Sequence, residues 1–214
     1  MPLRLIRSRQ KPGHVPPAAG AAQAPLATEL PPATLAQARR GEAAGCRAFV
    51  SLYERRVFTF ALRMLGDPSA AEDVAQDAFL RAFSALSRFD AAGPARLSTW
   101  LLTITHRLCL DELRRQRRHP NEALAHHADS LPTTAEAVGT GTDVGLTQRR
   151  WAAHAEQALL SLPAEQRAVF ALRVLMEMSV ADTAAALAVD EGTVKSRLSR
   201  AKTALRAHLG GLHE

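Results

Sequence analysis

The segment SVADTAAALAVDEGTVKSRLSRAKTALRAHL, residues 179–209, holds two helical patterns separated by a short turn. Ser179 and Asp182 have the spacing of a helix-capping box, and they predict the start of a short helix that ends near Leu187. A longer, basic helix is predicted over residues 192–209. A short apolar helix joined by a tight turn to a longer one is typical of a helix-turn-helix.

The second helix of this pair separates apolar from basic side chains. Its apolar positions recur at helical spacing and are expected to face a core: Val194, Leu198, Ala201 and Leu205. Its other faces carry Lys195, Ser196, Arg197, Arg200, Lys202 and Arg206. Such a helix suits the DNA major groove, where Arg and Lys donate to guanine and Ser or Thr can hold phosphate. Gly192 would let backbone approach DNA, and free N–H groups at the helix start would suit a phosphate. An ordinary basic helix on a small bundle remains an alternative.

Composition supports an all-α protein of two small domains. The 214 residues are 47% hydrophobic but only 5% aromatic, which favours helix formers over strand formers. The formal net charge of +6 favours a polyanionic partner. Cys46 and Cys109 lack the spacing of a metal site and are expected to be free thiols in a reducing cytoplasm. No apolar run is long enough for a membrane span.

Residues 49–119 carry three further helical patterns. The first spans 49–65, and Asp67 followed by Pro68 is a typical start for the second. Ser98 is expected to cap the third. An arginine-rich block ends this third helix after an aromatic segment, and the residues concerned are Phe89, Trp100, Arg107, Arg114, Arg115, Arg117 and Arg118.

Two interpretations of this aromatic and basic group stay open. Rings beside arginines make a surface that stacks on and attracts single-stranded bases. Alternatively, Phe89 and Trp100 belong to the core, and the arginines complement the dipole at the helix end. The preceding helix has a polar face that suggests a protein partner with positive charge, or simply a solvated face: Glu72, Asp73, Gln76 and Asp77.

The order of these patterns predicts the domain organisation. A Pro- and Ala-rich disordered extension is expected over residues 1–33, a first domain over 34–119, a flexible linker over 120–147 and the helix-turn-helix domain over 148–214. No catalytic set, metal site or phosphate loop emerges, so neither an enzyme nor a cofactor is expected. The linker histidines lack partners at metal spacing.

Two blocks of sequence resemble bacterial RNA polymerase sigma factors. The first contains LGD at 65–67, AEDVAQDAFLR at 71–81, FD at 89–90, TWL at 99–101 and DELRR at 111–115; the second contains LPAEQR at 162–167 and GTVKSRLSRA at 192–201. Two such blocks in this order, without a third domain between them, resemble the extracytoplasmic-function (ECF) group.

The resemblance implies a division of roles among the residues. Docking on the β′ clamp helices of core polymerase is implied for Asp73, Gln76, Asp77, Phe79 and Leu80. Recognition and melting of the −10 element, with capture of flipped bases, is implied for Phe89, Arg96, Trp100, Arg107, Arg114, Arg115 and Arg118. Recognition of the −35 element is implied for Gly192, Thr193, Lys195, Ser196, Arg197 and Arg200. The β flap and an anti-sigma protein are further implied partners.

The sequence departs from the family pattern at a few positions. His106 and Arg107 stand where the family often has Arg and Asn, and Glu177 and Ala188 replace glycines common around the helix-turn-helix. Two other functions stay open on the residues alone. One is a stand-alone helix-turn-helix regulator whose first domain senses or dimerises. The other is an adaptor that binds only proteins.

Overall fold

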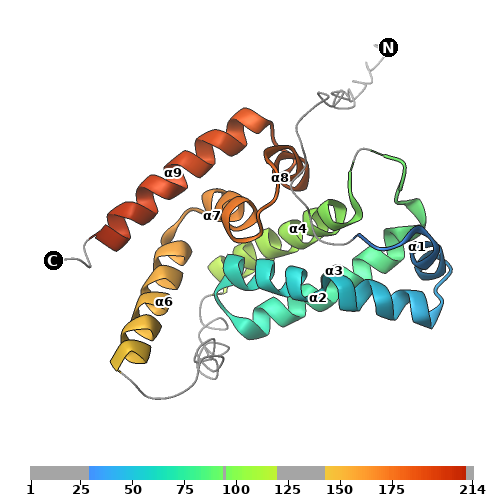
Figure 1. Cartoon of the computed structure of the whole chain (residues 1–214), viewed down its shortest axis with the longest axis horizontal. Helices are drawn as coiled ribbons and strands as arrows, with labels where there is room; N and C mark the ends of the chain where they lie inside the picture. Colours follow the sequence, from blue (N-terminus) through green and yellow to red (C-terminus); the bar gives the residue numbers. More distant parts are fainter. Residues whose placement is uncertain (1–28, 94, 120–142, 211–214) are drawn as a thin grey trace, which may run out of the picture.

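The computed structural model describes residues 29–93, 95–119 and 143–210, and every regular element in these ranges is a helix. The first half of the chain contains α1 (Pro32–Arg39), α2 (Ala43–Leu65), α3 (Pro68–Ala85), the short 3-10 turn η1 (Leu86–Arg88) and α4 (Leu97–Arg118). The second half contains α6 (Asp143–Ser161), α7 (Ala164–Phe170), η2 (Ala171–Leu175), α8 (Val180–Leu187) and α9 (Glu191–Gly210) (Figure 1). The predicted all-α fold is confirmed.

The core of the first half lies between α2, α3 and α4. Phe49 packs edge-on against Tyr53 and Phe79, with ring centroids 5.3 and 5.8 Å apart. Gly66 ends α2 in the left-handed conformation, with a φ of 75°. The Asp67 carboxylate then accepts the N–H of Ala70 at 2.7 Å, so the predicted cap of α3 is confirmed.

Two local predictions in the first half are wrong. The cap of α4 is Arg96, which makes no side-chain cap hydrogen bond, whereas Ser98 lies inside the first turn and donates to Glu29. Glu29 also accepts from the Tyr53 hydroxyl at 2.8 Å, and the Leu30 N–H donates to that hydroxyl at 3.2 Å. Chain expected to belong to the disordered extension is therefore anchored from Glu29 onward; residues 1–28 lie outside the described residues.

The second half has the predicted helix-turn-helix. Ser179 accepts the N–H of Asp182 at 2.9 Å and caps α8, as its spacing predicted. The side chains of Val194 and Ala201, both on α9, are fully buried. The turns before and after α8 both contain non-glycine residues with positive φ, Glu177 and Ala188, each at 54°.

The linker prediction is corrected at its C-terminal end. Residues 120–142 lie outside the described residues, but α6 begins at Asp143 and includes the last five residues assigned to the linker, 143–147. The error has a local cause, because Gly145 interrupts the apolar periodicity there, although a single glycine weakens a helix by only about 1 kcal/mol.

The two halves pack against each other, which the sequence did not predict. Helix α8 lies on α4, while α6, α7 and η2 contact α2. One hydrophobic cluster contains buried residues from both halves. Figure 1 shows α8 next to α4, with α9 on the outer side of the molecule.

Candidate nucleic-acid interface

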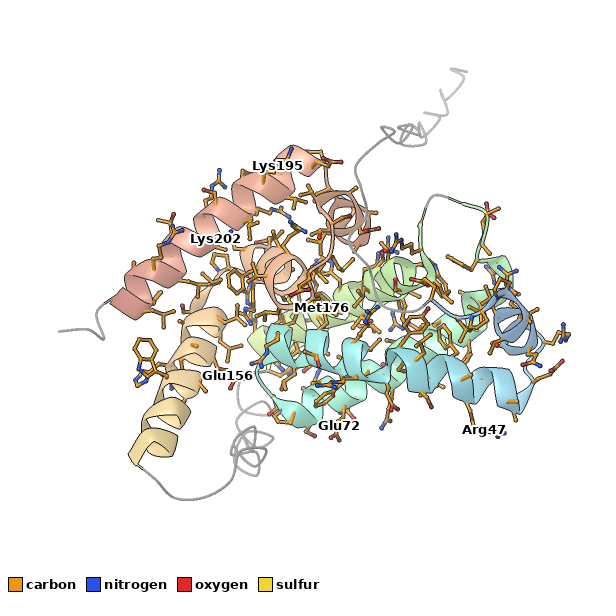
Figure 2. The ribbon with its side chains drawn as sticks, in the orientation of Figure 1. Arg47, Glu72, Glu156, Met176, Lys195 and Lys202 are labelled. Atoms are coloured by element: carbon orange, nitrogen blue, oxygen red, sulfur yellow. The ribbon has the colours of Figure 1, made fainter. Side chains whose placement is uncertain are left out.

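The first turns of α9 present basic and hydroxyl side chains to solvent. Lys195, Ser196 and Arg200 are exposed, opposite the buried Val194 and Ala201. Figure 2 shows Lys195 and Lys202 on the outer edge of the molecule, away from the first half. This arrangement is the one the helical periodicity predicted, with an apolar back and a cationic front.

The start of α9 differs from the expectation of a phosphate site. The Asp190 carboxylate accepts the Thr193 N–H at 2.7 Å and the Thr193 hydroxyl at 2.6 Å. These hydrogen bonds hold the pKa of Asp190 below its ordinary value. A Cβ on Gly192 would lie 3.0 Å from this carboxylate, so the glycine leaves room for the cap. Because the Asp190 carboxylate accepts the Thr193 N–H, that N–H is not free for a phosphate.

Arg197 does not point fully outward as expected. Its side chain is half-buried, and its charge acts on His106 of α4. His106 is 9% exposed, its Nε2 atom is buried without a hydrogen-bond partner among the described residues, and its ring lies 6.3 Å from that of Phe60. Burial, followed by the charges of Arg197 and Arg107, lowers the pKa of His106 to about 4.

The residues predicted for the −10 element form two groups toward opposite ends of α4, with Arg107 between them. Phe89 and Trp100 are half-buried and stack obliquely, with centroids 5.1 Å apart and planes at 43°. Arg39 donates to the Phe89 carbonyl and fixes the segment before the loop. Arg96, which lies between Phe89 and Trp100 in the sequence, is half-buried. Arg107 is exposed midway along the helix.

The arginine block lies about 20 Å along the helix from Trp100, at 1.5 Å per residue. Arg114 pairs with Asp111 and Arg115 with Glu112, each at 2.8 Å, and Arg118 is exposed. Partnered charges give the block a weaker field than its four arginines suggest. The sequence analysis treated the aromatic and basic residues as one group. In the structure the ring pair of Phe89 and Trp100 and the arginine block are two separate groups.

Helix α3 presents the acidic and amide face that its sequence predicted. Asp73, Gln76 and Asp77 are exposed, and Leu80 is 64% exposed beside them. Figure 2 shows Glu72 on this face, on the side of the molecule opposite Lys195. Phe79 does not belong to the face: it is only 9% exposed and packs on Phe49. Its assignment to polymerase docking is corrected, because its side chain belongs to the core.

The cysteines and possible metal sites add no chemistry to this interface. Cys46 and Cys109 are free thiols, as expected, and burial raises the pKa of Cys109 to about 12. No cluster of His, Cys, Asp and Glu within the described residues could hold a metal ion. None of the described helices has both the length and the apolar character required to cross a bilayer.

Comparison with known proteins identifies the two halves. Residues 49–119 match the family model "Sigma-70 region 2", and residues 155–205 match "Sigma-70, region 4". The chain is 36% identical over 180 residues to the ECF RNA polymerase sigma factor SigL of Mycobacterium tuberculosis, covering 83% of this chain and 96% of that protein.

The chain belongs to the ECF sigma factors.

Other relatives agree with this membership. SigW of Bacillus subtilis is 29% identical over 179 residues, covering 82% of this chain and 95% of that protein. Among solved structures, the sigma factor RpoE of Bartonella quintana, in complex with the anti-sigma factor NepR, superposes with a TM-score of 0.60 at 25% identity, covering 77% of this chain and 96% of that one. CnrH, in complex with the cytosolic domain of CnrY, shares the fold with a TM-score of 0.59 at 24% identity, over 84% of this chain and 96% of that one.

Membership decides between the functions that the residues left open. An ECF sigma factor binds core RNA polymerase and promoter DNA and directs promoter-specific transcription initiation. Sequence reasoning missed two residues that shape the site, Asp190 and Glu29. The spacing from Asp190 to Thr193 is a capping signal that could have been found, whereas Glu29 meets Ser98 only through the tertiary fold.

Proposed function

We propose that α9 recognises the −35 element through its first three turns. The observation that carries this assignment is the exposure of Lys195, Ser196 and Arg200 over the buried Val194 and Ala201. Arg and Lys donate to guanine O6 and N7 in the major groove, and hydroxyls hold phosphate. Thr193, held by Asp190, sets the angle of the first turn, and Gly192 accommodates the cap. Arg197 would join this surface when its side chain moves away from His106 of α4.

The proposed −10 site uses the two ends of α4 differently. Phe89 and Trp100 form a ring pair at the loop before α4, where an unstacked base would find an aromatic surface. Extruding a base costs a few kcal/mol, and stacking of about 1–3 kcal/mol per base offsets much of that cost. Arg96 and Arg107 would hold the adjacent backbone. At the far end of α4 the proposed contacts are to phosphates only: Arg114, Arg115 and Arg118.

The proposed polymerase contact is the polar face of α3. Leu80 is apolar and 64% exposed, and Asp73, Gln76 and Asp77 surround it on the same helix. An apolar centre with a charged rim is the usual anatomy of a protein–protein contact. We assign this face to the β′ clamp helices and the second half of the chain to the β flap.

An anti-sigma protein is a further proposed partner. RpoE and CnrH were solved bound to the anti-sigma factor NepR and to the cytosolic domain of CnrY, respectively. The basic α9 of this chain would suit an acidic inhibitor surface. We also propose that the protein acts in the cytoplasm, where core polymerase and DNA are found, and that it uses no cofactor and catalyses no reaction of its own.

Base-specific loss of promoter use tests the assignment of α9. Arg200→Ala should weaken transcription from dependent promoters by about 1–3 kcal/mol, roughly 5- to 150-fold, and relax the preference at one base pair of the −35 element. Lys202→Ala is the matched control, since Lys202 is also exposed but lies in the fourth turn of α9, beyond the proposed contacts. The readout is run-off transcription on a library with a randomised −35 element. An unchanged sequence preference in Arg200→Ala would rule out base recognition by this residue.

A further inference from the structure

The chain from Glu29 to the end of α1 is packed firmly onto the first half of the protein. Leu30, Leu35 and Ala38 are buried members of its hydrophobic core. A Cβ on Gly45 of α2 would lie 2.7 Å from the backbone of Gln37, so α1 and the start of α2 are in direct backbone contact. Helix α1 also contacts η1, and Figure 1 shows it beside the end of α3. This stretch therefore has a fixed position next to the segment that leads into α4.

One end of α1 holds the backbone of Phe89. The guanidinium of Arg39, the last residue of α1, donates to the Phe89 carbonyl. On its other side, the Phe89 N–H donates to the Leu86 carbonyl at 3.2 Å, within the turn of η1. Both backbone polar groups of Phe89 thus have partners, and one of them is a charged donor, which makes the stronger kind of hydrogen bond. The direction in which the Phe89 ring leaves the backbone is fixed by these two hydrogen bonds.

The other end of the same stretch holds the start of α4. One oxygen of Glu29 accepts the hydroxyl of Ser98, and the other accepts the Tyr53 hydroxyl at 2.8 Å. The Leu30 N–H donates to that hydroxyl at 3.2 Å. Burial, followed by the hydrogen bond to Glu29, raises the pKa of Tyr53 above its ordinary value, so the hydroxyl keeps its proton and remains a donor. Ser98 lies two residues before Trp100, and its own side chain is buried.

The ring pair lies between these two attachments. Phe89 comes just after η1 and Trp100 is in the first turn of α4, yet their ring centroids are 5.1 Å apart. A surface that stacks on an unpaired base needs its rings held in one geometry before the base arrives. Rings that must first be ordered lose part of the binding free energy to that ordering. Residues that fix both ends of the ring pair therefore act on base capture without touching the base.

We propose that residues 29–39, here called the brace, are a positioning element for the −10 site, in which Arg39 holds Phe89 and Glu29 holds the start of α4 beneath Trp100. The inference rests on the proposed function of the ring pair. Arg39 and Glu29 are positioning residues, because they act through Phe89 and Ser98. A direct contact of the exposed Arg39 with a DNA phosphate is the competing role, and the experiments below separate the two.

Fluorescence of the full chain without DNA tests whether the brace orders the rings. The sequence has two tryptophans, so Trp151→Phe leaves Trp100 as the single reporter. In this background, Arg39→Ala and Ser98→Ala should each raise the acrylamide quenching constant of Trp100 about twofold, because Phe89 would cover the indole for less of the time. An unchanged quenching constant in both variants would overturn the proposal.

Arg40→Ala is the matched control for Arg39→Ala. It removes the same charge at the same end of α1, but Arg40 pairs only locally, with Glu42 at 2.6 Å. Its quenching constant should equal that of the parent, and circular dichroism should give the same helix content for all the variants. A rise in Arg40→Ala equal to that in Arg39→Ala would overturn the role of the hydrogen bond to Phe89.

Open-complex formation with core polymerase tests the consequence for the −10 element. The probe is a promoter with 2-aminopurine in the non-template strand of that element, and base preference is read on libraries randomised at −10 or at −35. Arg39→Ala should lower open-complex formation about tenfold, since one hydrogen bond to a charged group is lost. It should weaken the preference at −10 and leave the preference at −35 unchanged. Arg39→Lys, which keeps a cationic donor, should restore most of the loss. Equal losses of preference at both elements would contradict a positioning role at −10.

A double-variant cycle separates positioning from direct contact. If Arg39 acts through Phe89, then Arg39→Ala should have little further effect in the Phe89→Ala background. A full additional tenfold loss there would show that Arg39 binds DNA by itself, and it would overturn the proposal. Trp100→Ala tests the proposed function separately. An unchanged −10 preference in Trp100→Ala would remove the ring pair from the −10 site, whereas the quenching measurement would still decide whether the brace orders the rings.

Discussion

Ala188 offers the sharpest test of how the helix-turn-helix is built. It ends α8 with φ 54° and ψ 45°, a left-handed conformation. The turn is fixed by two hydrogen bonds, from the Ala188 N–H to Ala185 at 3.3 Å and from the Val189 N–H to Ala184 at 3.0 Å. An L-residue pays about 1–2 kcal/mol for this conformation, and glycine does not. Ala188→Gly should therefore stabilise the protein.

The size of the gain follows from two opposing effects. Relief of the left-handed strain contributes about 1–2 kcal/mol, and the greater freedom of glycine in the unfolded chain takes back about 0.5–1 kcal/mol. Ala188 is exposed, so loss of its methyl group sacrifices little buried surface. The net increase in the free energy of unfolding should be about 0.5–1 kcal/mol, or a rise in Tm of about 1–4 °C for a chain of this size.

Ala185→Gly is the matched control, because it makes the same substitution in the same helix. Ala185 is also exposed, but it lies within α8 and has a helical backbone. Glycine there should lower the free energy of unfolding by about 1 kcal/mol. Chemical denaturation of the three proteins measures both changes. Destabilisation by Ala188→Gly, of a size similar to that of Ala185→Gly, would refute the left-handed turn.

Three further predictions concern other parts of the molecule. Glu177→Gly, at the other left-handed position, should stabilise by a similar amount and add to Ala188→Gly, as denaturation of the double variant would show. Because His106 has a folded pKa of about 4 against an ordinary value near 6.5, the unfolded chain binds its proton more readily. His106 should therefore stabilise the fold fully above pH 6.5 and lose about 2 kcal/mol between pH 7 and 5, a loss that denaturation of His106→Leu should not show. Reversal of Asp73 and Asp77 to Lys should abolish co-purification with core polymerase without changing the melting curve, and retained co-purification would remove α3 from the polymerase contact.

The local features of this protein could be predicted from its sequence. Apolar periodicity gave the buried residues of α9, and the capping signals at Asp67 and Ser179 gave the starts of α3 and α8. These signals act between residues three or four positions apart, so no tertiary information is needed. The docking role that family resemblance implied for Phe79 is not supported by its burial, since the side chain is only 9% exposed.

Contacts distant in sequence could not be predicted in the same way. Ser98 was expected to cap α4, but Glu29, 69 residues away, accepts its hydroxyl. Arg167 belongs to a recognisable motif, yet its hydrogen bond to Met64 spans 103 residues and depends on how the halves dock. The half-burial of Arg197 has the same origin, because its charge lies close enough to His106 of α4 to lower the pKa of that group.

Reconstituted transcription tests the central claim most directly. Core polymerase is mixed with a dependent promoter, with or without this protein, and start sites are mapped while permanganate detects unpaired thymines near −10. We predict that specific transcripts and permanganate-reactive thymines appear only with the protein, and that changing either the −35 or the −10 element abolishes both. Tight binding of the protein to the duplex in the absence of polymerase, without start-site-specific transcripts in its presence, would contradict the account.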